Sequence, residues 1–144
     1  MTPEEENKLR DLNSGDMVKI QEAAYWLERH RAYHLIDAMK ESRKTMPARV
    51  ALRDYRLNVD RCIRVLENFR SGAKCHCNLY GHGSDFSLNG EVMDGFLKVE
   101  KETVFHEEYY SEFQVVCQHC ARRWRIREVF GYHYPTYEWY DLRR

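Results

Sequence analysis

The sequence lacks any run of about 18 consecutive apolar residues, and its first ten residues are acidic and polar. We therefore expect no membrane span and no signal peptide, and predict a soluble, cytoplasmic protein. A charge surplus is also missing, because 23 Lys and Arg residues balance 23 Asp and Glu residues. Global charge thus gives no reason to expect binding to nucleic acid or to an anionic membrane.

Recognisable catalytic motifs are absent as well. The chain has no Ser-His-Asp order, no Gly-rich phosphate loop, no HExxH, and no matched pair of carboxylates on one helical face. Cys62 falls on an apolar helical stripe, where a cysteine acts as a small buried hydrophobe instead of a nucleophile. We therefore expect that the protein is not an enzyme.

The 144 residues, 43% of them hydrophobic, suffice for one compact unit or for two small subdomains that share a core. Residues 1–72 show helical spacing of apolar residues and are predicted to form a helical bundle. Thr2-Pro3 predicts the start of a first helix, Ser14 or Asp16 caps a second, a turn falls near His30, and Pro47 opens the last.

Residues 73–144 are rich in aromatic and β-branched residues between turn residues, which is typical of an antiparallel sheet. The predicted strands are 74–80, 96–106, 109–116 and 123–130, with a last strand or extended arm at 134–140. The stretch 81–95 is predicted to be a long exposed loop. The expected fold class is α+β, a helical bundle packed on a metal-stabilised antiparallel sheet.

Four of the five cysteines form two close pairs, Cys75 with Cys77 and Cys117 with Cys120. Such pairs suit a metal better than disulfides, because each short loop offers two thiolates from one tight turn. We therefore predict one structural zinc ion held by these four residues. A site of four thiolates leaves no position for a catalytic water, so the metal would contribute folding energy.

Two questions about this site stay open at the level of sequence. Iron could take the place of zinc, and His76, His82 or His119 could replace one of the cysteines. Four reduced cysteines without a metal are a further interpretation, but it does not explain why the closely spaced cysteines all fall in one half of the chain.

The segment 122–127 allows two interpretations. Its arginines alternate with Trp124 and Ile126, so one face of that strand is basic and the other apolar. The basic face could grip a phosphate backbone, or it could pair with the acidic strand next to it. The candidate nucleic-acid contacts are Arg122, Arg123, Arg125 and Arg127.

Two further features could serve a protein partner. Residues 131–140 contain five large aromatic side chains, which are typical of binding hot spots but also of an ordinary core. Residues 85–112 carry eight acidic and two basic residues and form a local acidic block, either a solvated face or an attractive surface for a basic partner. The predicted partner contacts are Glu100, Glu102, Glu107, Glu108, Tyr137 and Trp139.

The stretch from Gln114 to Trp139, with CQHC followed by Arg-Arg-Trp and Gly-Tyr-His-Tyr-Pro, resembles the knuckle-and-strand half of zinc-ribbon domains. It departs from that pattern in two places. The first cysteine pair here is CxC and not CxxC, and Ala121 follows the second pair where ribbons often have glycine. The resemblance implies a metal knuckle and no particular role.

In general character, a small protein with an acidic face and an aromatic-rich segment resembles the immunity proteins that bacteria make beside secreted toxins. This resemblance implies a protein partner such as a toxin domain and carries over no individual residue. The preferred hypothesis is therefore a zinc-stabilised protein that binds another protein. The alternative is a nucleic-acid-binding zinc module that uses the basic strand.

Overall fold

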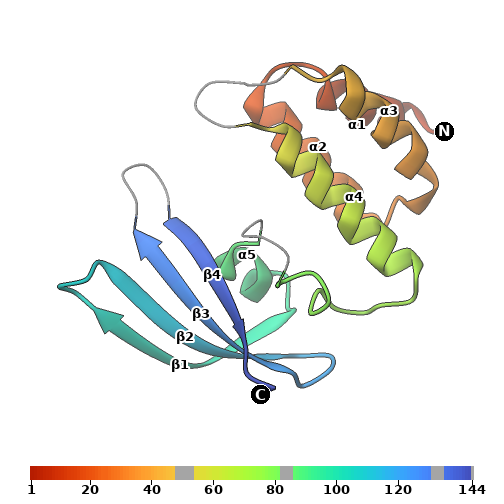
Figure 1. Cartoon of the computed structure of the whole chain (residues 1–144). Coiled ribbons are helices and arrows are strands. Elements are labelled where there is room, and N and C mark those ends of the chain that lie inside the picture. The colour runs from red at the N-terminus through yellow and green to blue at the C-terminus, as the bar shows by residue number, and fades with distance from the viewer. Residues whose placement is uncertain (48–53, 82–85, 131–134, 144) are drawn as a thin grey trace. The chain divides into compact units, whose positions relative to one another are not determined.

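The computed structural model describes residues 1–47, 54–81, 86–130 and 135–143 (Figure 1). Helices occupy the N-terminal part and a four-stranded antiparallel sheet the C-terminal part, so the predicted α+β class is confirmed. The chain divides into two compact units, which we call the helical unit (Met1–Ala73) and the sheet unit (Lys74–Arg144). In the described part of the chain, no helix has the length and apolar character needed to cross a membrane.

The helical unit starts with two helices whose caps follow the sequence. Helix α1 (Pro3–Leu12) begins after Thr2, whose hydroxyl accepts the backbone N–H of Glu5 at 3.1 Å. Helix α2 (Met17–Arg29) is capped by Asp16, one of the two predicted candidates. Arg31, at φ 50°, makes the predicted turn into the 3₁₀ helix η1 (Tyr33–Leu35) and helix α3 (Ile36–Thr45).

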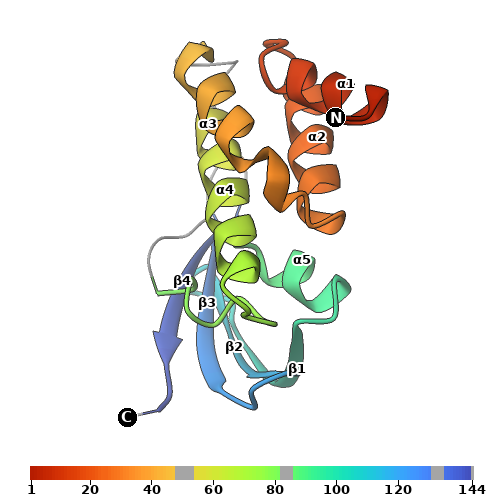
Figure 2. The same cartoon turned by 90° about the vertical axis from the view of Figure 1, so that its right-hand side faces the viewer.

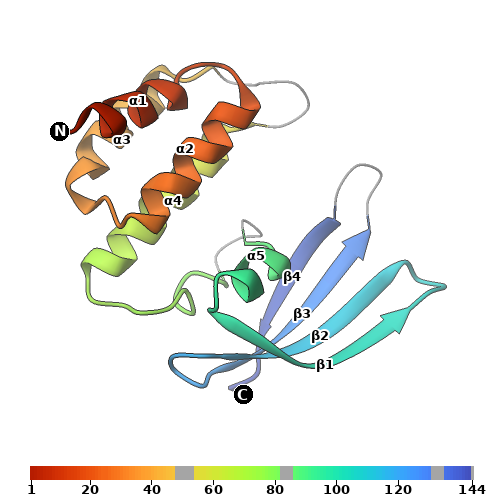
Figure 3. The same cartoon turned by 180° about the vertical axis from the view of Figure 1, so that it is seen from behind.

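Helix α4 (Arg56–Arg70) completes this unit and ends at its C-cap Ser71. The prediction that Pro47 opens this helix is wrong, because Pro47 and residues 54–55 are not helical; residues 48–53 lie outside the described part of the chain. Helices α2 and α4 run side by side (Figures 1 and 3), and the Cys62 thiol donates to the carbonyl oxygen of Ala24 at 3.4 Å. Cys62 is fully buried, as predicted, and burial raises the pKa of its thiol well above the usual value.

The sheet is an antiparallel meander in the order β1-β2-β3-β4 (Figure 2). Its strands are β1 (Leu97–Phe105), β2 (Tyr110–Cys117), β3 (Arg123–Phe130) and β4 (Pro135–Asp141). The four predicted strands in this region are therefore confirmed, with boundaries that differ by one residue at most positions. A bulge between Val99 and Lys101 interrupts the pairing of β1 with β2.

Two predictions in the sheet unit are wrong. Residues 74–80 form consecutive turns instead of a strand, because the backbone bonds locally, as from Leu79 N–H to the His76 carbonyl oxygen at 2.8 Å. The predicted loop 81–95 contains helix α5 (Leu88–Met93), which Ser87 caps and which buries Leu88. Residues 82–85 of that loop lie outside the described part of the chain.

The register divides the sheet into two faces. The inner face holds the buried side chains of Val115, Trp124 and Ile126. The strand pairing places Glu102, which lies opposite Phe113, on the same face, together with Phe130 at the end of β3. The outer face holds all lysines and arginines of the four strands, namely Lys98, Lys101, Arg123, Arg125 and Arg127. The basic and apolar residues that alternate along β3 are therefore separated across the sheet, as the sequence predicts.

Candidate metal centre

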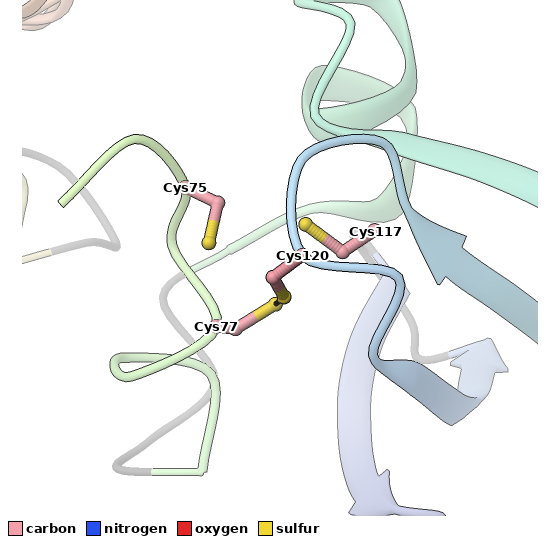
Figure 4. Close-up of side chains that lie close together, drawn as sticks. All are labelled: Cys75, Cys77, Cys117 and Cys120. Carbon is pink, nitrogen blue, oxygen red and sulfur yellow. Dashed lines mark hydrogen bonds between the residues drawn. The ribbon is translucent and has the colours of Figure 1, made fainter.

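Two short loops of the sheet unit bring the four predicted cysteines together (Figure 4). Cys75 and Cys77 lie on the turns that precede α5, and Cys117 and Cys120 lie on the turn that joins β2 to β3. The side chains of the two loops point toward one another. Cys77 and Cys117 are buried, Cys75 is half-buried and Cys120 is exposed, so the cluster lies at the edge of the core.

The spacing of the sulfur atoms fits a single metal ion. All four Sγ atoms lie within 4.8 Å of one another, and those of Cys77 and Cys120 are 3.6 Å apart. A tetrahedral ion with Zn–S bonds of about 2.3 Å places its sulfurs about 3.8 Å apart, whereas a disulfide needs about 2.05 Å. None of the four cysteines forms a disulfide. The cluster can therefore hold a metal ion, and its soft donors suit zinc or iron.

The second loop has the backbone of a metal knuckle. The Cys117 N–H donates to the Arg122 carbonyl oxygen at 2.8 Å, and the Ala121 N–H donates to the Cys117 carbonyl oxygen at 3.1 Å. Ala121 closes this turn at φ 63°, a left-handed conformation that glycine adopts more easily. The residue that follows the second cysteine pair therefore has a backbone conformation that favours glycine, although it is an alanine here.

The surroundings of Cys75, Cys77 and Cys117 shift the pKa values of their thiols in different directions. Burial raises the pKa of Cys75 and also that of Cys77, where the indole N–H of Trp124 partly opposes the effect. Burial acts in the same direction on Cys117, but the backbone N–H groups of Cys120 and His119 outweigh it and lower that pKa. A divalent cation would favour the thiolate form at all four positions.

The first loop is anchored by two residues that were not predicted from the sequence, Glu91 and Tyr80, and the candidate ligand His76 contacts Glu91. The His76 side chain is buried and its Nδ1 lies 2.6 Å from Oε1 of Glu91, which also accepts the hydroxyl of Tyr80 at 2.7 Å. Glu91 is itself buried, on α5. The Ser87 cap could have indicated α5 from the sequence, but no local pattern indicates that its glutamate meets His76. His119 is exposed in the second loop, and His82 lies outside the described residues.

The four candidate nucleic-acid contacts all have partners within the sheet unit. Arg122 pairs with Asp141, and Arg123 pairs with Glu100 at 2.9 Å. Arg127 pairs with Glu112 at 3.1 Å, and the Arg125 guanidinium lies 4.7 Å from the centre of the Tyr140 ring. The interpretation in which the basic strand pairs with neighbouring acids therefore describes this face of the sheet.

The predicted partner contacts fall into two groups. Tyr137 is 8% exposed and the Trp139 ring stacks on Tyr80 at 4.2 Å, so both belong to the packing of the sheet unit. Glu102 is exposed on β1, and Glu107 and Glu108 are exposed in the turn between β1 and β2. Among the described residues, no ion pair involves these three glutamates, whereas Glu100 is bound to Arg123.

No protein-family model, no curated protein and no solved structure matches this chain. The geometry of each unit is therefore the basis for a proposed function.

Proposed function

We propose that this protein is a non-enzymatic, zinc-stabilised module that binds another protein through the acidic end of its sheet, the end that lies away from the metal. Four thiolates would saturate a tetrahedral zinc ion and leave no position for water or substrate. The zinc therefore supports the sheet and takes no part in a reaction. The observation that carries the binding proposal is that the lysines and arginines of the strands all lie on the outer face of the sheet, which leaves acids as the charged residues of the inner face.

On the inner face, the strands carry acids and no lysine or arginine. Near the metal this face is covered, because Tyr80 packs edge-on against Trp124 and stacks on Trp139. At the end of the strands away from the metal this face is open, and the exposed fractions are 46% for Val104 and 53% for Phe130. An apolar surface bordered by unpaired acids suits a partner that presents apolar and basic side chains together.

Exposed aromatic side chains at this end offer better anchors than the buried Tyr137 and the partly buried Trp139, whose ring is stacked on Tyr80. Tyr109 is 73% exposed, follows Glu107 and Glu108, and accepts the Phe130 N–H on its carbonyl oxygen at 3.2 Å. Tyrosine is one of the residues most enriched among interface hot spots. The proposed surface, which we call the hairpin surface, consists of Glu102, Val104, Glu107, Glu108, Tyr109 and Phe130.

Neutralisation of a toxin is the most specific form of this function. A toxin that acts on nucleic acid needs a basic surface, and an acidic protein can cover that surface in place of the phosphates. This form is supported by the acidic and aromatic character of the hairpin surface alone. Binding of nucleic acid by the outer face is less favourable, because Arg123 and Arg127 would have to give up their carboxylate partners.

Site-specific cross-linking in the cells that produce the protein tests the proposal. A photo-reactive amino acid replaces Tyr109 in one variant and Tyr25 in the control, since Tyr25 is an exposed tyrosine of the helical unit. We expect a cross-linked protein partner from position 109 and not from position 25. The same adducts from both positions, or an adduct with nucleic acid, would contradict the proposal.

The electrostatic part is tested with the purified cross-linked partner. Reversing three charges, Glu102→Lys, Glu107→Lys and Glu108→Lys, should weaken binding at least about tenfold, because each lysine repels a basic surface. The control Glu22→Lys reverses an exposed charge on α2 and should leave affinity unchanged. Equal affinities of the triple variant and the control would reject the role of these glutamates.

A further inference from the structure

Glu91 is a buried carboxylate that the thiol cluster does not explain. It is 5% exposed, and His76 and Ser111 are the other buried polar side chains of the described residues. Burying a carboxylate costs several kcal/mol by general estimates unless hydrogen bonds compensate it. The position of Glu91 therefore indicates a specific function for its bonds.

Both side-chain hydrogen bonds of Glu91 reach the loop that carries Cys75 and Cys77. His76 stands between these two cysteines, and Tyr80 closes the same series of turns. Since both partners meet one oxygen atom, Oε1, the carboxylate fixes the loop at two points. Tyr80 is held in turn by the sheet, through its stack on Trp139 at 4.2 Å.

The same residue is connected to the second loop through Phe96. The Phe96 N–H donates to the carbonyl oxygen of Glu91 at 2.9 Å, and the Phe96 ring lies 4.1 Å from the ring of His76. The Phe96 carbonyl oxygen accepts the N–H of Gln118, also at 2.9 Å, between Cys117 and Cys120. Glu91 therefore contacts one cysteine loop with its side chain and is linked to the other by its backbone.

We propose that Glu91 is a positioning residue for the metal, which holds the loop of Cys75 and Cys77 in register with the knuckle of Cys117 and Cys120. This inference rests on the metal site of the proposed function. A loop that is ordered before the metal arrives loses less conformational entropy on binding, so the affinity is higher. Glu91 itself is not a ligand of the metal. It affects metal binding only through the positions in which the thiolates are held.

The test compares Glu91→Gln with Glu112→Gln in the whole protein. Glutamine keeps the size of the side chain but is a weaker acceptor for two donors, and Glu112 is a matched control because it is also bonded within the sheet unit, to Arg127. Zn²⁺ affinity is measured by competition with a coloured chelator, and Co²⁺ absorption reports which atoms coordinate the ion. We expect 10- to 100-fold weaker Zn²⁺ binding for Glu91→Gln, by analogy with other outer-shell groups, and no change for Glu112→Gln.

The Co²⁺ spectrum of Glu91→Gln should keep the wild-type form, because the same four thiolates still bind. Equal Zn²⁺ affinity of the two variants would overturn the inference. A changed spectrum would also overturn it, since a ligand would then have been lost, as would a Glu91→Gln protein that stays unfolded at saturating metal. A wild-type protein that binds no metal would instead remove the metal site itself.

Discussion

Removing the metal should unfold the sheet unit and leave the helical unit folded. The sheet unit has about 70 residues, and a core of that size rarely supplies more than about 3–5 kcal/mol. A structural zinc site contributes an apparent 10–16 kcal/mol in small zinc domains, as an order of magnitude. The metal term is larger than the rest of the stability of the unit, so the metal-free sheet is expected to be unstable.

The three tryptophans allow the two units to be followed separately. Trp26 lies in the helical unit, whereas Trp124 and Trp139 lie in the sheet unit. In a Trp26→Phe background the emission therefore reports on the sheet alone, and circular dichroism near 222 nm reports mainly on the helices. Adding a strong chelator should shift the emission toward that of exposed indole while most of the helical signal persists.

The double substitution Cys117→Ser with Cys120→Ser should reproduce the effect of the chelator and lower the metal content from about one ion per chain to none. The control is Cys62→Ala, which removes the cysteine of the helical unit and should keep the metal. Unchanged tryptophan emission after complete metal removal would refute the argument. Loss of the helical signal in the same transition would refute the independence of the units.

Three further results are expected. Ala121→Gly should stabilise the metal-bound sheet by up to about 1 kcal/mol in denaturant unfolding, because it relieves the left-handed alanine at φ 63°, and a loss would contradict this. Burial, and then the bond to Glu128, raises the pKa of Tyr137 to about 12, so the neutral phenol stabilises the fold below about pH 10 and this stability is lost as the pH rises through 12. The late step in tyrosinate absorbance should vanish in Tyr137→Phe, and its persistence would assign it to another tyrosine. Leu66→Ala should cost about 2–5 kcal/mol in the helical unit, and a parallel loss of metal would show that the units are coupled.

Sequence reasoning succeeded where the determinants are local. The cap at Thr2 depends on a few adjacent residues, and the strand β3 depends on alternation within eight. The cysteine pairs predicted the cluster because each pair can face a metal from a single turn, whatever the rest of the fold does. These signals do not require knowledge of distant contacts.

The failures concern residues whose environment is set by distant parts of the chain. The stack of the Trp139 ring on Tyr80 joins two residues that are far apart in the chain, and no local pattern around either residue indicates it. In the same way, the sequence shows Glu91 only as one acid in an acidic block, and its contact with His76 depends on where the fold places helix α5. Residues 74–80 include aromatic and apolar side chains typical of a strand, but they form the turns that carry Cys75 and Cys77 instead.

The charge of a bound metal site would also affect where a partner can bind. Four thiolates and one Zn²⁺ ion would carry a net charge of −2, which groups near this partly exposed cluster would have to balance. Arg122 lies beside this cluster, because its Nη1 is 3.4 Å from the Cys77 carbonyl oxygen, but its charge is already paired with Asp141. It is therefore not available to bind phosphate, and Arg123, Arg125 and Arg127 are engaged on the outer face. Glu102, Glu107 and Glu108 of the hairpin surface take part in no ion pair among the described residues and lie toward the end of the strands away from the cysteine cluster, so a basic partner attracted by charge should dock there.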